Sequence, residues 1–124
     1  MTVDPRTDVP HASQIRGLWI GLLLAPVAFL INLELAYALV PTACSSRNEL
    51  PVHLVHLTCL ILTIVGGLTA WRSWNAVGAD WPGETGGPLA RSQFMAGTGM
   101  LLSALFALVI VAMWIPSLVL DPCQ

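Results

Sequence analysis

The sequence predicts an all-α membrane protein in which three transmembrane helices form an up-down-up bundle. The composition, three long apolar runs and the positions of the arginines predict it. Of the 124 residues, 56% are hydrophobic and 10% are charged, against about 25% charged residues in an average soluble domain. So few charges cannot cover the surface of a small water-soluble protein, and lipid is expected to face most side chains. The net charge of -2 also leaves no basic patch for nucleic acid.

The three apolar runs set the expected domain boundaries. A helix needs about 20 apolar residues to cross the hydrocarbon of a bilayer, and the runs predict a transmembrane domain over 18–120 with helices over 18–40, 54–74 and 94–119. Pro41 is expected to end the first helix because proline lacks an N–H donor. Residues 1–17 are expected to form a flexible cytoplasmic N-terminus, 41–52 a polar hairpin, 75–90 an irregular loop and 121–124 an external tail.

The arginines predict the orientation of the helices. Four of them, Arg6, Arg16, Arg72 and Arg91, fall on one side of the predicted membrane, and Arg47 falls on the other. Because basic residues concentrate in cytoplasmic segments, the N-terminus is expected in the cytoplasm and the C-terminus outside. A cleaved signal peptide over the first run is the alternative interpretation. The run is long for such a peptide, and polar residues interrupt it.

The cysteines predict one disulfide. In the expected topology Cys44 and Cys123 both lie outside the membrane, whereas Cys59 lies within the second span. Disulfides form in oxidising compartments, so we expect Cys44 and Cys123 to pair and tie the C-terminal tail to the end of the first helix. The alternatives are two separate thiols or two ligands of a copper ion.

Polar residues inside the spans predict a buried cluster. An ionisable side chain in hydrocarbon is costly and needs protein or water beside it. Glu34 and His56 have similar expected depths in two antiparallel helices, so we expect a hydrogen bond or ion pair between them, with Tyr37 and His53 one turn nearer the surface. Asn32 lies on nearly the opposite side of the first helix from Glu34. The bundle cannot easily cover both, so either water or another membrane protein is expected against this helix.

The two histidines of the second span also raise the question of a metal. His53 and His56 stand three residues apart, and two imidazoles at this spacing can reach one ion. Structural metal sites usually have four ligands, and haem sites in bundles usually take histidines from facing helices. Polar contacts between helices are therefore the favoured interpretation. No metal or other cofactor is predicted, and copper or haem remains the alternative.

Small residues predict where the helices pack closely. They recur along one face of each span and allow neighbouring backbones to approach. The expected packing residues are Gly21, Ala25 and Ala28 in the first span, Thr63 and Gly67 in the second, and Gly99, Ser103 and Ala107 in the third.

Several segments resemble a known group of proteins. The segments LELAYALVPTAC, HLVHLTCLILTIVGGLTAWRSW and GGPLARSQFMAGTGMLLSALFALVIVAMWIPSLVLDPCQ resemble small uncharacterised bacterial inner-membrane proteins found in gene neighbourhoods of cytochrome c oxidase and its copper-assembly factors. The features that look recurrent in that group are here Tyr37 to Cys44, His53 or His56, Ala70 to Arg72, and Pro122 to Cys123. The resemblance implies a bacterial inner-membrane location and an association with respiration, and it brings no catalytic residues.

The sequence and the resemblance together lead to one functional hypothesis and two alternatives. The hypothesis is a non-catalytic accessory or assembly subunit of a respiratory membrane complex, a haem-copper oxidase, with another integral membrane protein as its partner. The first alternative is a small membrane protein that binds copper or haem through His53 and His56. The second is an oligomeric transporter or channel built around Glu34.

Overall fold

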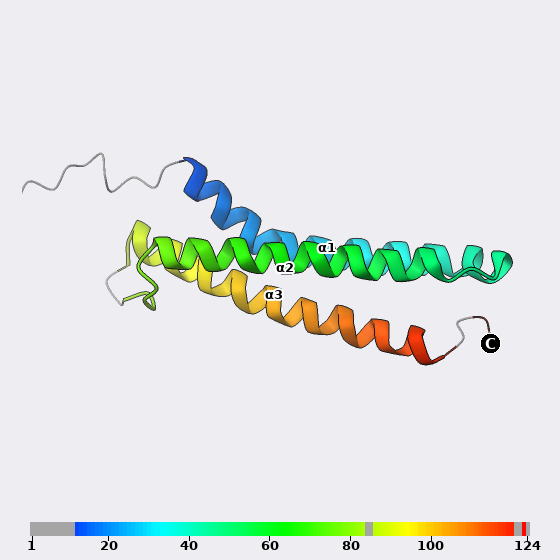
Figure 1. Ribbon diagram of the computed structural model, residues 1–124. Helices are drawn as coiled ribbons and strands as arrows, with labels where there is room; N and C mark the ends of the chain where they lie inside the picture. Colours follow the sequence, from blue (N-terminus) through cyan, green and yellow to red (C-terminus); the bar gives the residue numbers. More distant parts are fainter. Residues whose placement is uncertain (1–11, 84–85, 121–122, 124) are drawn as a thin grey trace, which may run out of the picture.

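Three helices make up the fold. The computed structural model describes residues 12–83, 86–120 and 123, and contains α1 (Ala12–Ser46), α2 (Leu50–Ala76) and α3 (Pro88–Val119). They run in alternating directions and each packs against the other two (Figure 1). Each is long and apolar enough to cross a membrane. The all-α three-helix bundle expected of a multi-pass membrane protein is therefore confirmed.

The helices are longer than the predicted spans, and the prediction that Pro41 ends the first helix is wrong. α1 begins at Ala12 and continues through Pro41 to Ser46. Pro41 is exposed, and its missing N–H removes one backbone hydrogen bond, that to the Tyr37 carbonyl. Transmembrane helices tolerate such a loss. The expected hairpin over 41–52 shrinks to three residues between α1 and α2.

The turn between α1 and α2 supplies the actual end of the first helix. Arg47 adopts a left-handed backbone conformation (φ 51°), and the Asn48 N–H donates to the Ala43 carbonyl at 3.2 Å. This is the hydrogen bond that closes a Schellman motif. The Asn48 side chain then accepts the Leu50 N–H at 3.0 Å, which starts α2. A local backbone motif, and not proline, therefore reverses the chain.

Pro26 lies in the first half of α1, five residues after Gly21, where α1 contacts both α2 and α3. Its missing N–H removes the bond to the Leu22 carbonyl, and proline within a helix is a common cause of a bend. Figure 1 shows the N-terminal part of α1, in blue, turning away from α2 and α3. The first turn of α1 is exposed at this end, whereas α2 and α3 remain in contact, with Gly97 against Trp74. We call it the arginine end because Arg16, Arg72 and Arg91 lie there.

The bundle is tightest where small residues of all three helices meet. A Cβ atom added to Gly21 would lie 2.9 Å from the Cα atom of Ala70, and one added to Gly99 would lie 2.9 Å from the Gly21 carbonyl oxygen. Neither distance is possible for a real side chain. Only glycine at these two positions allows the backbones of α1, α2 and α3 to approach so closely.

Adjacent glycines in α2 face different helices. A Cβ atom on Gly66 would lie 3.3 Å from the Leu24 side chain of α1, whereas one on Gly67 would lie 3.1 Å from the Ser103 side chain of α3. Most of the predicted packing residues are buried, namely Gly21, Ala25, Ala28, Thr63, Gly99 and Ser103, whereas Gly67 and Ala107 are half-buried. The prediction missed Gly66 and Ala70, which form a small residue pair four positions apart and could have been found by that spacing.

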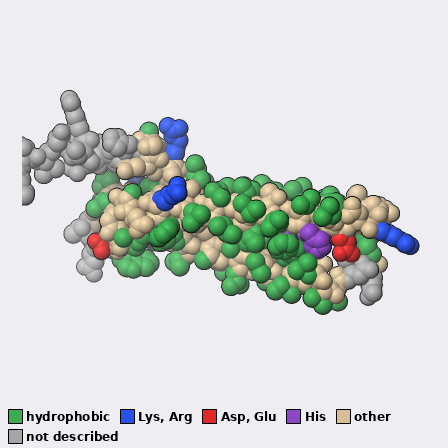
Figure 2. All heavy atoms as spheres, in the orientation of Figure 1, with side chains coloured by type: hydrophobic (Ala, Val, Ile, Leu, Met, Phe, Trp, Pro, Cys, Tyr) green, Lys and Arg blue, Asp and Glu red, His purple; other side chains and the backbone are tan. Residues whose placement is uncertain are grey.

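Apolar side chains cover the outside of the bundle. Exposed large hydrophobic residues occur along all three helices. On the face shown in Figure 2, hydrophobic side chains occupy the length of the molecule and charged ones gather near its two ends. A surface of this kind suits contact with a lipid bilayer.

Candidate functional site

A disulfide marks one end of the bundle. Cys44 in the last turns of α1 is bonded to Cys123, which follows α3, and their Cα atoms are 5.4 Å apart. The predicted pairing is confirmed, so these two sulfurs are neither separate thiols nor copper ligands. Cys59 is buried in α2 as a free thiol. We call the region around the bond, with Glu49, His53 and Trp114, the disulfide end.

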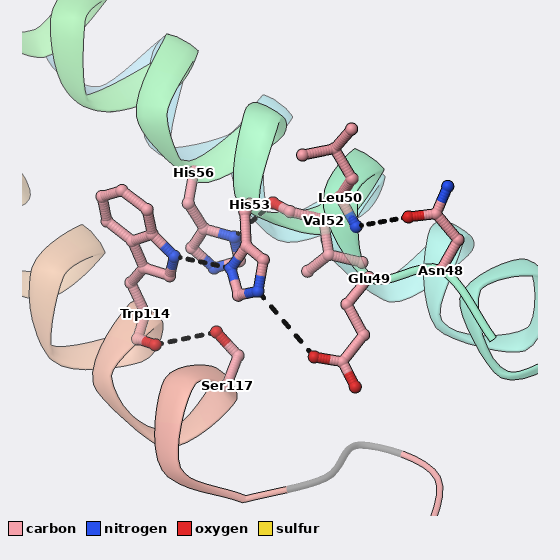
Figure 3. A network of polar contacts seen from close by, with 8 residues as sticks. All are labelled: Asn48, Glu49, Leu50, Val52, His53, His56, Trp114 and Ser117. Atoms are coloured by element: carbon pink, nitrogen blue, oxygen red, sulfur yellow. Dashed lines mark hydrogen bonds and ion pairs between the residues drawn. The ribbon is translucent and has the colours of Figure 1, made fainter.

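His53 links two helices at the disulfide end. The indole N–H of Trp114 in α3 donates to His53 Nδ1 in α2 at 2.9 Å (Figure 3). Because Nδ1 accepts this bond, the proton of a neutral His53 lies on Nε2. That nitrogen is 3.8 Å from Oε2 of Glu49, the residue that precedes α2. Nδ1 of His53 is therefore held by a hydrogen bond, and Nε2 lies near a carboxylate but beyond hydrogen-bond distance.

His56 lies deeper and is held differently. Its ring is buried, and Nδ1 lies 2.9 Å from the Val52 carbonyl, to which it donates. The ring stacks on Trp114, with centroids 6.1 Å apart and planes 19° from parallel. Trp114 thus contacts both histidines, one through its N–H and one through its face (Figure 3).

This arrangement disfavours a metal or haem site at the histidine pair. A metal ligand must offer a nitrogen lone pair, and His53 uses its lone pair to accept the Trp114 N–H. Only Nε2 of His56 remains. Within residues 12–83, 86–120 and 123, no three His, Cys, Asp or Glu side chains lie close enough to hold an ion. The contacts of His53 and His56 with Trp114 instead connect α2 to α3.

The predicted contact between Glu34 and His56 is wrong. Continuing the antiparallel register of α1 and α2 that the close approach of Gly66 to Ala25 defines places Glu34 level with Leu57, one residue from His56. The depth was predicted correctly, but the direction was not. Glu34 lies on the exposed side of α1 while His56 points into the bundle.

Helix geometry explains the error. Asn32 is fully buried, and a residue two positions along a helix turns by about 200°. Burial of Asn32 therefore sends Glu34 outward. Tyr37, also predicted for the buried cluster, follows Glu34 to the outside and is 84% exposed. The expected opposition of Asn32 and Glu34 is confirmed.

The buried polar residues within the bundle are only partly satisfied. Among the described residues, both amide atoms of Asn32 and the hydroxyl of Ser103 have no hydrogen-bond partner. The Thr63 hydroxyl donates to the Cys59 carbonyl at 2.8 Å within its own helix. Such groups face protein because the alternative is lipid, which offers no hydrogen bonds at all.

The exposed side of α1 carries the most unusual feature of the molecule. Leu30, Glu34 and Tyr37 share this side, which we call the α1 outer face, and all three are exposed. In the part of the chain that the structure describes, Glu34 has no hydrogen bond and no ion pair. It lies six residues before the end of the predicted span, or about 9 Å inside it. A polar group of this kind on a surface otherwise suited to lipid requires something to cover it.

Known proteins provide no guide to this surface. No family profile, no curated protein and no solved structure matches the chain. Function must therefore be inferred from the residues and their geometry.

Proposed function

We propose that the chain is a non-catalytic accessory or assembly subunit of a respiratory membrane complex, a haem-copper oxidase, and that it packs against its partner through the α1 outer face. The observation that carries the proposal is Glu34, an acidic side chain exposed at membrane depth without a partner in its own chain. An ionised group at the centre of a helix in a bilayer costs about 2.5 to 3.5 kcal/mol on insertion scales. A helix of a second protein removes that cost if it brings a hydrogen-bond donor.

The chemistry of the face defines what the partner must offer. A carboxylate accepts hydrogen bonds, so the partner needs an Arg, His, Ser, Thr or Tyr side chain at the level of Glu34. Tyr37, one turn away, adds a hydroxyl and a large ring that are both exposed. Leu30, one turn in the other direction, is exposed as well and offers an apolar contact on the same side.

The resemblance and the arginines supply the remaining parts of the proposal. The resemblance to inner-membrane proteins from oxidase gene neighbourhoods supports a respiratory complex as the partner. The four-to-one distribution of arginines supports a cytoplasmic N-terminus, which places Glu34 in the outer half of the bilayer. A second copy of this chain is the other possible cover for Glu34, and the test below separates the two.

Affinity purification from gently solubilised membranes tests the proposal. Wild-type chain is expected to retain oxidase subunits, and Glu34→Leu is expected to lose most of them. Thr58→Leu is the matched control, because Thr58 is an exposed polar residue at the same depth on α2, and it should retain the partner. Purification of the wild-type chain without oxidase subunits would contradict the subunit proposal. Purification with only further copies of itself would favour an oligomer around Glu34.

Stability of the purified chain gives a second readout with the opposite sign. Without a partner, Glu34→Leu removes a polar group from the lipid-facing surface and should raise resistance to unfolding in bilayers or detergent. Loss of the partner together with a more stable chain therefore identifies Glu34 as a contact residue. Loss of the partner with a less stable chain would mean that Glu34 serves the fold itself, contrary to the proposal.

A further inference from the structure

The bend of α1 leaves a cavity at the arginine end. The cavity has a volume of about 430 Å³, within the range of small-molecule sites in proteins. It lies between the first turns of α1 and the start of α3. Its walls include Ile15, Leu18 and Trp19 from α1 and Pro88, Arg91 and Met95 from α3.

The cavity combines apolar walls with a single positive charge. Arg91 is the only charged residue among those that line it, and within the described residues its guanidinium has no ion-pair partner. The Ser92 hydroxyl is already used, since it donates to the Pro88 carbonyl at 3.0 Å. An unpaired guanidinium beside apolar walls suits the negative group of an otherwise apolar ligand.

A second cavity extends the positive region. It has a volume of about 210 Å³, shares Leu18 and Ser92 with the first, and has Arg72 in its wall. Arg91 and Arg72 therefore flank the same part of the bundle. Among the described residues, the acidic residue at this end is Asp80, in the loop between α2 and α3, and it lines neither cavity. The charge within the two cavities is therefore complementary to an anion.

An apolar groove continues from the first cavity along α1. It is lined only by Trp19, Ile20, Leu23, Leu24 and Val27, and Trp19 belongs to both the cavity and the groove. The nine residues from Trp19 to Val27 span about 12 Å along the helix. A hydrocarbon chain fits such a surface, whereas a small water-soluble anion gains nothing from it.

We propose that this cavity and groove bind one anionic phospholipid, with its phosphate at Arg91 and an acyl chain along the groove. Trp19 lies at the junction, where the headgroup of a lipid meets its tails, and tryptophan favours that level of a membrane. The groove occupies the first half of α1 and ends at Val27, one turn before Leu30 of the α1 outer face. Arg91 lies far from Glu34 along the bundle, so either proposal can fail without the other.

Native mass spectrometry of the purified full chain tests the site with two defined lipids, dioleoyl phosphatidylglycerol and dioleoyl phosphatidylcholine. The wild-type chain is expected to retain one molecule of the anionic lipid at concentrations where it releases the zwitterionic one. Arg91→Gln should weaken retention about tenfold, since a charge-assisted hydrogen bond to phosphate is lost. Arg47→Gln makes the same change of charge at the disulfide end, where Arg47 is exposed, and should behave as wild type.

Two further arms keep the site falsifiable. Ile15→Trp narrows the cavity while keeping every arginine, and it too should release the anionic lipid. Inorganic phosphate at millimolar concentration should not displace the lipid. Equal retention by Arg91→Gln and Arg47→Gln, equal retention of both lipids, or displacement by inorganic phosphate alone would each overturn the proposal.

Discussion

The two ends of the bundle are held together in different ways. At the disulfide end, the Cys44–Cys123 bond joins α1 to the segment after α3, and the Trp114 N–H bonds α3 to His53 of α2. At the arginine end, among the described residues, the only hydrogen bond between separate elements is the one from the Gln93 side chain to the Val77 carbonyl, at 3.3 Å. Side-chain links join the helices at the disulfide end, whereas close backbone packing near Gly21 holds them towards the arginine end.

The difference separates a fixed end from one that can adapt. Regions with few links open locally at a lower free energy than regions with many. The cavity between α1 and α3 at the arginine end leaves space for a ligand, and the linked helices of the disulfide end set the orientation of the α1 outer face. Variants that remove the links one at a time test this comparison.

Among these links, the disulfide should make the largest contribution to the stability of the folded chain. It closes a loop with a sequence separation of 79 residues, and a native disulfide typically stabilises by about 2 to 4 kcal/mol by restricting the unfolded chain. The double variant Cys44→Ser, Cys123→Ser should lower the thermal unfolding midpoint of the purified protein. A reductant should lower the wild-type midpoint equally and leave the double variant unchanged. A wild-type protein insensitive to reductant would show that the bond adds nothing to this end.

Two glycines of α1 test the close packing with the same substitution. Gly21→Ala should destabilise by about 1 to 3 kcal/mol, because its Cβ would overlap the α2 backbone at Ala70. Gly17→Ala is the control, since its Cβ would meet only the Ser73 hydroxyl at 3.4 Å, an ordinary contact. Alanine also favours the helix over glycine by about 0.5 to 1 kcal/mol. In urea or detergent unfolding, the free energy of unfolding should therefore fall for Gly21→Ala and rise for Gly17→Ala. Equal shifts for the two variants would contradict the close packing at Gly21.

The architecture followed from the sequence because it depends on averages over many residues. Three runs of about 20 apolar residues leave a membrane helix as the main solution for each. The disulfide followed from topology, since Cys44 and Cys123 fall on the same side of the membrane when the chain crosses it three times. Both predictions tolerate errors of several residues at a helix boundary.

The polar contacts could not be predicted in the same way because they depend on direction. A side chain turns by about 100° for each residue along a helix, so equal depth did not bring Glu34 and His56 together. The partner of His53 is Trp114, 61 positions away, and no short-range pattern indicates it. The place of Trp114 near the end of the third apolar run indicates its depth but not its bond.

The hydrogen bond between Trp114 and His53 should make the third largest contribution to the stability of the folded chain. Trp114→Phe keeps a ring against His56 but removes the donor, and loss of one such hydrogen bond costs about 0.5 to 1.5 kcal/mol. Trp71→Phe is the control, because Trp71 is 55% exposed and no hydrogen bond of its side chain occurs among the described residues. Unfolding measurements on the two variants separate the bond from the general loss of an indole. If both lose the same amount, Trp114 acts by packing alone.

Removing the Gln93 link should have the smallest effect. Gln93→Leu deletes the bond to Val77, but the Val77 carbonyl ends α2 beside an exposed loop, where water can replace the donor. We expect a loss below about 0.5 kcal/mol, at the low end for a hydrogen bond. Amide hydrogen exchange over residues 77–83 reports local opening at the arginine end. Gln14→Leu is the control, because it removes another polar side chain at the same end. A loss from Gln93→Leu as large as that from Trp114→Phe would mean that a side-chain link holds the arginine end as firmly as the other. The cavity there would then be a fixed feature of the fold and not a consequence of few links.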